Sequence, residues 1–235
     1  MAFNSPAEKK QYVTAMFARI ARRYDLMNRL MTGGQDIRWR RLLVKQANLR
    51  PGGRLLDIAT GTGDVAFEAL RQQSGLTHVV GADLTLPMMQ VGRQRALDVG
   101  RLSWCGADTL RLPFADNSFD AVTSGFLMRN VTSVAQALAE QRRVCRPGGR
   151  VLALDVPRPP NNLGGHLFRL YFHHIVPILG GLIAGQHEAY RYLPASADAF
   201  LRPNELKTIM EEVGLYAVSY TMLMFNTVAL HVGIK

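Results

Sequence analysis

The sequence predicts an α/β fold whose mostly parallel, Rossmann-like sheet ends in a C-terminal antiparallel hairpin. Five short apolar runs alternate with segments able to hold a helix or crossover, which is typical of a parallel sheet with helices on both faces. Two further runs follow each other at the end of the chain with no helix between them, so they must pair antiparallel. The five parallel runs are Arg54–Ile58, His78–Asp83, Leu102–Ala107, Phe119–Phe126 and Arg150–Val156.

Amphipathic segments precede the first of these strands. Residues 6–32 carry apolar side chains at helical spacing among lysines and arginines, which predicts one basic amphipathic helix or two. Gly33 and Gly34 interrupt the pattern, and Asp36–Leu49 predicts another helix. We therefore expect residues 1–50 to form an N-terminal helical cap and residues 51–157 to form the core of the sheet.

Residues 158–200 form a predicted insertion between the fifth strand and the last helix. Its segment 161–186 is apolar, but His166, Arg169, Pro177 and several glycines interrupt it. It falls short of the roughly 20 uninterrupted apolar residues that a membrane-spanning helix needs. We expect a lid over the strand ends, where ligands bind in such sheets, with an ordinary core helix as the alternative.

The C-terminal residues 201–235 are expected to complete the core sheet. Pro203–Val213 predicts a helix, and Leu215–Leu223 and Thr227–Ile234 predict the two strands of the hairpin.

Length, charge and cysteine content bound the function. A chain of 235 residues, 48% of them apolar, can bury the core of one domain. Its formal net charge of +10 favours phosphate-bearing partners: nucleic acid, anionic lipid or a phosphorylated substrate; a merely solubilising basic surface is the alternative. No continuous apolar run follows the early lysines, so we expect no secretory signal and a cytoplasmic protein. Cys105 and Cys145 form no metal-ligand spacing, so we expect reduced thiols and no metal.

A glycine-rich turn follows the first predicted strand. In an open α/β sheet this turn must bring backbone close to the ligand, and glycine permits that approach. Gly61, Thr62 and Gly63 occupy it, and Asp83 follows at the end of the second strand. With Ala66, the same glycines also satisfy a dinucleotide fingerprint, so a nicotinamide or flavin enzyme is the competing interpretation.

Charge separates these two interpretations. Asp57 lies in the strand before the turn and Asp64 begins the helix after it. Two carboxylates would repel a pyrophosphate, whereas S-adenosylmethionine has no phosphate and carries an ammonium and a sulfonium cation. A like-charge approach at about 4 Å costs on the order of 4 kcal/mol at an effective dielectric of about 20. The turn therefore predicts S-adenosylmethionine as the cofactor and a class I methyltransferase fold.

Side chains at the other strand ends fit the same cofactor. Asp83 can accept hydrogen bonds from both ribose hydroxyls, and Asp108 with Thr109 can meet the adenine edge. Gly125, at the end of the fourth strand, leaves room beside the methionine part. An acid at one strand end is weak evidence, but the ordered set is strong.

Six segments resemble the quinone-biosynthesis C-methyltransferases, which act on demethylmenaquinol and on a ubiquinol precursor. The Pro-Phe-x-Asp and Arg-Pro-Gly-Gly pieces recur in many methyltransferases, whereas Tyr-Asp-x-Met-Asn and Arg-Asn-Val are more specific. The matching segments are 17–28, 112–120, 128–131, 146–149, 190–193 and 228–233. Two departures stand out: Thr60 replaces a usual glycine, a conservative change for the cofactor, and Phe126-Leu127-Met128 replaces Phe-Gly-Leu, which alters the substrate-side wall.

The resemblance implies methylation of an aromatic carbon. Such a carbon becomes nucleophilic when a ring hydroxyl loses its proton, so a cation or base near that oxygen should help most. We expect Arg129 to orient a water or stabilise the phenolate, with Asn130 and Tyr24 completing the catalytic cluster. The alternatives are a structural ion pair for Arg129, a helix N-cap for Asn130 and a core-edge role for Tyr24.

The implied substrate is a polyprenylated quinol, which lives in the bilayer. We therefore expect a cytoplasmic enzyme associated peripherally with the inner face of the membrane through its basic helices and apolar insertion, and a homodimer is compatible with this. The menaquinone and ubiquinone pathways both remain open. A lipid or other small-molecule methyltransferase and a non-catalytic S-adenosylmethionine-binding protein are further alternatives. Nucleic acid is disfavoured because residues 124–130 lack the Asn/Asp-Pro-Pro-aromatic element of base-amino methyltransferases.

Overall fold

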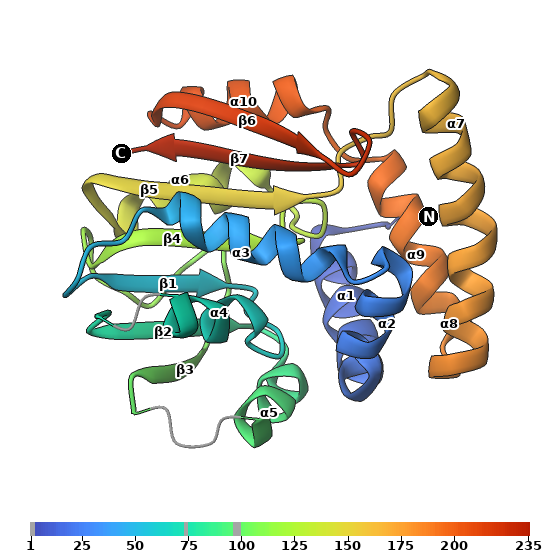
Figure 1. Cartoon of the computed structure of the whole chain (residues 1–235), viewed down its shortest axis with the longest axis horizontal. Helices are drawn as coiled ribbons and strands as arrows, with labels where there is room; N and C mark the ends of the chain where they lie inside the picture. The colour runs from blue at the N-terminus through green and yellow to red at the C-terminus, as the bar shows by residue number, and fades with distance from the viewer. Residues whose placement is uncertain (1–2, 73–74, 96–99) are drawn as a thin grey trace.

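Seven strands form one sheet in the computed structural model, which describes residues 3–72, 75–95 and 100–235 (Figure 1). The strand order is β3-β2-β1-β4-β5-β7-β6, with β1 to β5 parallel and β7 antiparallel to both β5 and β6. The predicted mostly parallel sheet with a C-terminal hairpin is confirmed. The strands are β1 (Arg54–Ile58), β2 (His78–Asp83), β3 (Leu102–Gly106), β4 (Phe119–Gly125), β5 (Cys145–Asp155), β6 (Tyr216–Leu223) and β7 (Val228–Ile234).

The fifth strand begins five residues earlier than the sequence predicted. Cys145 already pairs with Phe119, and the register then jumps so that Arg150 pairs with Ala121. Gly148, at φ 76°, lies within the extra residues. Residues 147–149 are thus an irregularity within the strand, because strand pairing is present on both sides of them.

Alternate strand residues face two separate apolar layers. Leu55, Ala121 and Leu152 pack with α3 (Gln35–Ala47) and α4 (Asp64–Gln72). Their neighbours Leu56, Val122 and Val151 pack with α6 (Val134–Val144) and α10 (Pro203–Glu212) on the other face. The remaining crossover helix is α5 (Leu86–Arg95). Helices therefore cover both faces, as the alternation of runs predicted.

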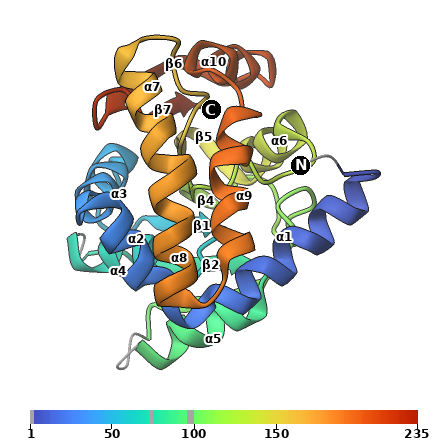
Figure 2. The same ribbon diagram turned by 90° about the vertical axis from the view of Figure 1, so that its right-hand side faces the viewer.

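A third layer of helices stands at the carboxyl ends of the parallel strands, where Figure 2 views it face on. Met16, Met27, Val176 and Tyr190 are among the residues that join its N-terminal and late segments in one apolar cluster. The segments are α1 (Pro6–Ile20), the 3₁₀ turn η1 (Ala21–Arg23), α2 (Tyr24–Thr32), α7 (Leu163–Leu170), the π turn η2 (Tyr171–Ile175), α8 (Val176–Ala184) and α9 (His187–Asp198).

The helix formed by α7, η2 and α8 differs from the expectation. It runs without a break over 22 residues, Leu163–Ala184, and its most apolar stretch has a mean hydropathy of 1.4. By length and composition it could cross a membrane, so the estimate that this segment is too short and too interrupted was wrong. Pro177 is tolerated because it lies in the first turn of α8, beside the π turn.

Candidate functional site

Two adjoining cavities lie at the carboxyl ends of the parallel strands. The larger, about 860 Å³ including the part open to solvent, is lined by residues that follow β1, β2, β3 and β4 and is closed over by α1 and α2. The smaller, about 400 Å³, shares five of its residues with the larger: Tyr24, Ala59, Gly61, Gly125 and Phe126. No described residue of 158–200 lines either cavity, so the N-terminal cap, and not the insertion, covers this site directly.

The glycine turn after β1 has the backbone geometry that the sequence predicted. Gly61 and Gly63 have φ angles of +57° and +86°. A Cβ on Gly61 would come within 3.2 Å of the Met88 Cε atom in the wall of the larger cavity. Gly63 lines neither cavity; a Cβ there would lie 2.6 Å from the Trp104 ring, so its requirement is packing. Thr62 lines only the smaller cavity, and its hydroxyl donates to Asp25 at 2.6 Å.

Asp57 is buried beneath this turn. Its carboxylate accepts hydrogen bonds from the hydroxyls of Thr60, at 2.7 Å, and Thr123, at 2.9 Å. Burial nevertheless raises the pKa of Asp57 to about 7. Thr60 fits because Gly81 leaves room for it: a Cβ on Gly81 would lie 3.0 Å from the threonine side chain. The departure at Thr60 therefore adds a hydrogen bond to Asp57.

Asp83 joins the glycine turn to the end of β2. One carboxylate oxygen accepts from the Gly61 amide at 2.8 Å, and the other accepts from the Thr85 amide at 2.7 Å. Burial raises the pKa of Asp83 even so. Each oxygen keeps a second lone pair, and the side chain lines the larger cavity, so it can receive two hydroxyl donors there.

Asp108 and Thr109 line the larger cavity beyond β3. Asp108 accepts from the Leu110 amide at 2.9 Å and pairs with the Lys10 ammonium of α1 at 2.6 Å. Burial opposes ionisation of this carboxyl, but Lys10 and the Leu110 amide outweigh it and hold the pKa of Asp108 below its usual value. The Thr109 hydroxyl is buried without a hydrogen-bond partner among the described residues, which suits a ligand that supplies one.

Lys9 and Lys10 hold α1 over the larger cavity, a role that the sequence did not predict. The Lys9 ammonium donates to the Val131 carbonyl at 2.7 Å, and burial lowers the pKa of Lys9. Lys10 reaches Asp108 98 positions along the chain. The sequence offers two adjacent lysines on a basic helix, a pattern that predicts surface charge and gives no hint of these partners.

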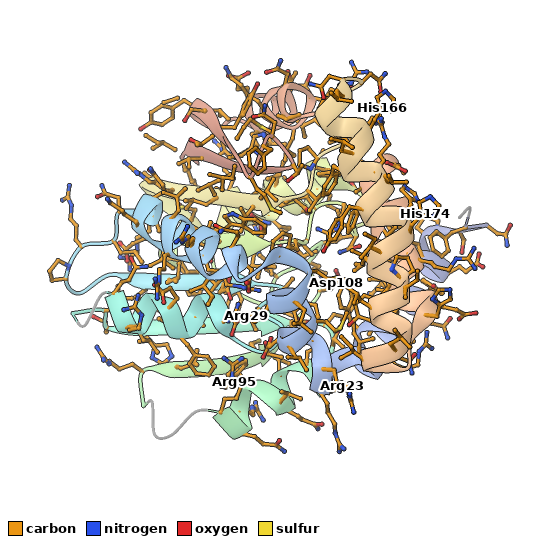
Figure 3. The ribbon with its side chains drawn as sticks, turned by 45° about the vertical axis from the view of Figure 1, so that its right-hand side comes forward. Arg23, Arg29, Arg95, Asp108, His166 and His174 are labelled. Atoms are coloured by element: carbon orange, nitrogen blue, oxygen red, sulfur yellow. The ribbon has the colours of Figure 1, made fainter. Side chains whose placement is uncertain are left out.

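Three arginines surround the Asp64 carboxylate, which the sequence had suggested was free. Asp64 accepts from Arg95 at 2.7 Å, and its carboxylate also pairs with Arg29 at 3.3 Å and Arg40 at 3.4 Å. Arg29 and Arg95 reach it from α2 and α5 (Figure 3). The expectation that Asp64 repels a pyrophosphate as a free carboxylate is therefore wrong, because three cations compensate its charge. Asp57, which forms no ion pair with a described residue, is the flanking carboxyl that remains available to a cationic ligand.

Of the three predicted catalytic residues, Tyr24 and Asn130 line a cavity, whereas Arg129 does not. Tyr24 lines both cavities and Asn130 lines the larger. The Asn130 side-chain amide donates to the Phe126 carbonyl at 2.9 Å, and its oxygen accepts from the Tyr192 hydroxyl at 3.1 Å. Ser133, not Asn130, caps α6. Burial raises the pKa of Tyr24, although Arg40 and Arg129 act in the opposite direction.

Arg129 lies behind the cavity wall. Its guanidinium forms a buried ion pair with Asp155 and stands 5.4 Å from the centre of the Phe126 ring. Asp155 also accepts from the backbone amides of Arg129 and Val156. This pair joins the end of β5 to the turn after β4, and Arg129 lines neither cavity.

Neither cysteine lines either of the two cavities. Cys105 and Cys145 are free, and burial raises the pKa of the Cys145 thiol to about 11. Within residues 3–72, 75–95 and 100–235, no group of three or more histidine, cysteine, aspartate or glutamate side chains could hold a metal ion.

Comparison with known proteins gives consistent results. Residues 6–235 match the model of the ubiE/COQ5 methyltransferase family. A demethylmenaquinone methyltransferase of Thermus thermophilus is 46% identical and covers 93% of this chain and 99% of the relative. A demethylmenaquinone methyltransferase of Roseiflexus castenholzii is 45% identical over 98% of this chain and 96% of the relative. A ubiquinone/menaquinone biosynthesis C-methyltransferase of Hahella chejuensis is 40% identical over 97% and 93%.

Solved structures share the fold. A SAM-dependent methyltransferase of Aquifex aeolicus aligns with a TM-score of 0.61 at 15% identity, covering 83% of this chain and 88% of its own. Phosphoethanolamine N-methyltransferase 2 of Haemonchus contortus, in complex with S-adenosyl-L-methionine, gives 0.62 at 16% identity, covering 84% and 52%. Together with the strand-end cavity and the full-length family match, these findings show that the chain belongs to the ubiE/COQ5 methyltransferase family and is an S-adenosylmethionine-dependent methyltransferase.

Proposed function

We propose that this chain methylates a ring carbon of demethylmenaquinol to give menaquinol, the last step of menaquinone biosynthesis. Relatives that are 45–46% identical over nearly the whole chain carry the name demethylmenaquinone methyltransferase. The observation that carries the proposal is that Tyr24 and Asn130 line the same cavity as Asp83 and Asp108. Val13, Phe17, Phe126 and Leu127 add apolar walls, so the cavity suits an aromatic ring with a hydroxyl.

The strand-end residues are proposed to hold the cofactor. Asp83 would receive the ribose hydroxyls, and Asp108 with the partnerless Thr109 hydroxyl would meet the adenine edge. The glycine turn and Gly125 leave room for the methionine part. In the smaller cavity Asp57 would pair with its ammonium and Arg40 with its carboxylate, so a zwitterion meets both charges.

We propose that the Tyr24 hydroxyl donates a hydrogen bond to the substrate. The bound cofactor supplies a methyl group on a sulfonium centre for in-line displacement. The ring hydroxyl of the quinol would first lose its proton to water. Because the pKa of Tyr24 is raised, its hydroxyl stays protonated and can donate to the phenolate oxygen, and the Asn130 side chain lies on the same wall. The ring carbon would then form the new C–C bond as the C–S bond to the methyl group breaks. The cofactor would leave as S-adenosylhomocysteine, and the proton on the ring carbon would leave to water.

Arg129 is proposed to act through position and charge. Its ion pair with Asp155 fixes the turn that carries Phe126 and Asn130. The guanidinium also places positive charge behind the Phe126 ring, which favours a phenolate in the cavity.

A polyprenyl tail places the substrate in the bilayer. We therefore propose that the enzyme is cytoplasmic and associates with the inner face of the membrane without spanning it.

Labelled S-adenosylmethionine with demethylmenaquinol, offered reduced and oxidised, tests the proposal. We expect label in the reduced ring alone, because only the quinol gives a phenolate. Equal labelling of the oxidised ring, or label in neither, would contradict it. A ubiquinol precursor should be tested in the same assay, because the name of a relative at 40% identity mentions both ubiquinone and menaquinone biosynthesis. Preference for that precursor would transfer the proposal to the ubiquinone pathway.

A further inference from the structure

The long helix 163–184 has one face that no other part of the described chain covers. Six large apolar side chains lie on it, and each is between 48% and 80% exposed: Leu163, Leu167, Leu170, Ile175, Ile178 and Leu182. Residues on the inner side of the helix are buried, among them Gly165, Val176 and Gly180. An exposed apolar stripe of this length is unusual for a helix that only packs on a soluble core.

The π turn keeps this stripe straight. The first three leucines follow helical spacing, but Ile175 comes five residues after Leu170. In an unbroken α-helix such a step would rotate the second half of the stripe by about 100° away from the first. The π turn at Tyr171–Ile175 absorbs one extra residue and cancels this rotation.

A second apolar group adjoins this face. Phe225, at the turn between β6 and β7, is 95% exposed. Its neighbour Met224 packs in the same cluster as Phe168 and Phe172 of the long helix. Figures 1 and 2 both show this turn beside α7.

The acidic side chain Asp198 of α9 lies beside this helix and is paired with Arg169 and His173. Helix 163–184 contains no aspartate or glutamate, and His166 and His174 are exposed along it (Figure 3). The Arg23 guanidinium donates to the Ile183 carbonyl at the far end, next to exposed Arg22. Neither arginine forms an ion pair with any described residue. Such a rim complements an anionic surface, and it would repel the same rim on a second copy.

The inner side of the same helix packs in one cluster with residues that line the larger cavity. Val176 and Leu179 of α8 share a cluster with Phe17 and Tyr24, which line the larger cavity. The contact is close, since a Cβ on Gly180 would lie 2.1 Å from the Tyr190 ring of α9. The helix is therefore fastened to the protein along one side, and spanning a bilayer would break these contacts.

We propose that the face formed by the six apolar side chains and Phe225 docks on an anionic lipid bilayer, with helix 163–184 lying flat in the headgroup region. The reason for docking, delivery of a tailed quinol, rests on the proposed function. The place of the docking face rests on the geometry of the helix. Helix 163–184 then lies between the bilayer and the apolar cluster that borders the cavity.

Co-sedimentation with phosphatidylcholine vesicles, with and without phosphatidylglycerol, tests the surface. The double variant Leu167→Glu/Ile178→Glu should lower vesicle binding by about 100-fold, because two interfacial apolar groups are lost. Arg22→Gln should lower binding by about fivefold, and only to vesicles with phosphatidylglycerol. Tyr216→Glu is the matched control: it is 57% exposed and pairs with Ile234 at the far end of the sheet (Figure 1), so binding should not change.

Activity separates this inference from the proposed function. The double variant should keep full activity on a short-tailed demethylmenaquinol in solution and lose activity on a long-tailed one in vesicles, with an unchanged Tm. Wild-type vesicle binding by the double variant would overturn the docking face. Loss of a dimer in that variant, measured by analytical ultracentrifugation, would overturn it in favour of self-association. Failure of the wild type on both quinols would instead overturn the proposed function and leave the vesicle result standing.

Discussion

The cofactor side and the substrate side of the cavity are built in different ways. On the cofactor side, Gly61, Asp83 and Asp108 each lie at or just beyond the end of a strand. The Asp83 carboxylate accepts from the Gly61 and Thr85 amides, and Asp108 accepts from the Leu110 amide. On the substrate side, Asn130 is held by Tyr192 of α9 and Arg129 by Asp155 of β5, and Tyr24 is carried by α2. The sheet therefore preorganises the cofactor side, whereas helix packing must assemble the substrate side. Perturbing the two sides should have different consequences.

The largest effect is expected at the buried pair of Arg129 and Asp155. Arg129→Ala leaves Asp155 buried and unpaired, so the unfolding free energy should fall by about 3–5 kcal/mol. Urea denaturation measures this. The double variant Arg129→Ala/Asp155→Ala should recover part of the loss. Protein that remains folded should bind S-adenosylmethionine normally and lose turnover; lost cofactor binding would show that the two sides are not separable.

Tyr24→Phe should affect catalysis without affecting the fold. Removing the hydroxyl takes away the proposed donor to the phenolate, so kcat should fall by about 100-fold. The Kd for S-adenosylmethionine, measured by calorimetry, should stay the same. An unchanged kcat would assign Tyr24 to packing alone.

On the cofactor side, Asp57 should make cofactor affinity depend on pH. The folded protein holds this proton up to about pH 7, whereas the unfolded chain releases it near the usual value. The unfolding free energy of the cofactor-free protein should therefore fall as the pH rises through that window. The cofactor ammonium favours the carboxylate, so affinity should increase up to about pH 7 and then level off. Asp57→Asn should flatten this profile; a wild-type slope in the variant would exclude Asp57 as its source.

The smallest effect is expected where the two sides meet, at Lys10. Its pair with Asp108 is partly exposed and worth no more than about 1 kcal/mol, so Lys10→Gln should change the Kd for S-adenosylmethionine by less than about fivefold. The difference between wild type and variant should shrink with added salt. A large change at high salt would mean that Lys10 contacts the cofactor directly.

The same contrast explains what the sequence could predict. Strand ends follow from local apolar runs, so Asp83, Asp108, Thr109 and Gly125 were found on the cavity wall as expected. The Tyr24 and Asn130 positions came from resemblance, and the structure places both on that wall. Local pattern carries no information about a partner 98 residues away, so the Lys10–Asp108 pair was missed.

The errors have the same origin. Asp64 was treated as a free carboxylate because its three arginine partners lie on helices remote in sequence. Packing against Trp104 explains why residue 63 is a glycine, and its contact with the cofactor stays a prediction. The continuity of helix 163–184 was missed because the sequence does not show that a π turn and a proline can share one helix.

Locating the transferred methyl group tests the central claim most directly. Isotope-labelled S-adenosylmethionine is incubated with demethylmenaquinol, and the product is analysed by NMR and mass spectrometry. Label on the ring carbon in the wild type, reduced about 100-fold in rate in Tyr24→Phe, is the predicted result. Label on a ring oxygen, or no transfer to any quinol by protein that binds S-adenosylmethionine, would contradict it.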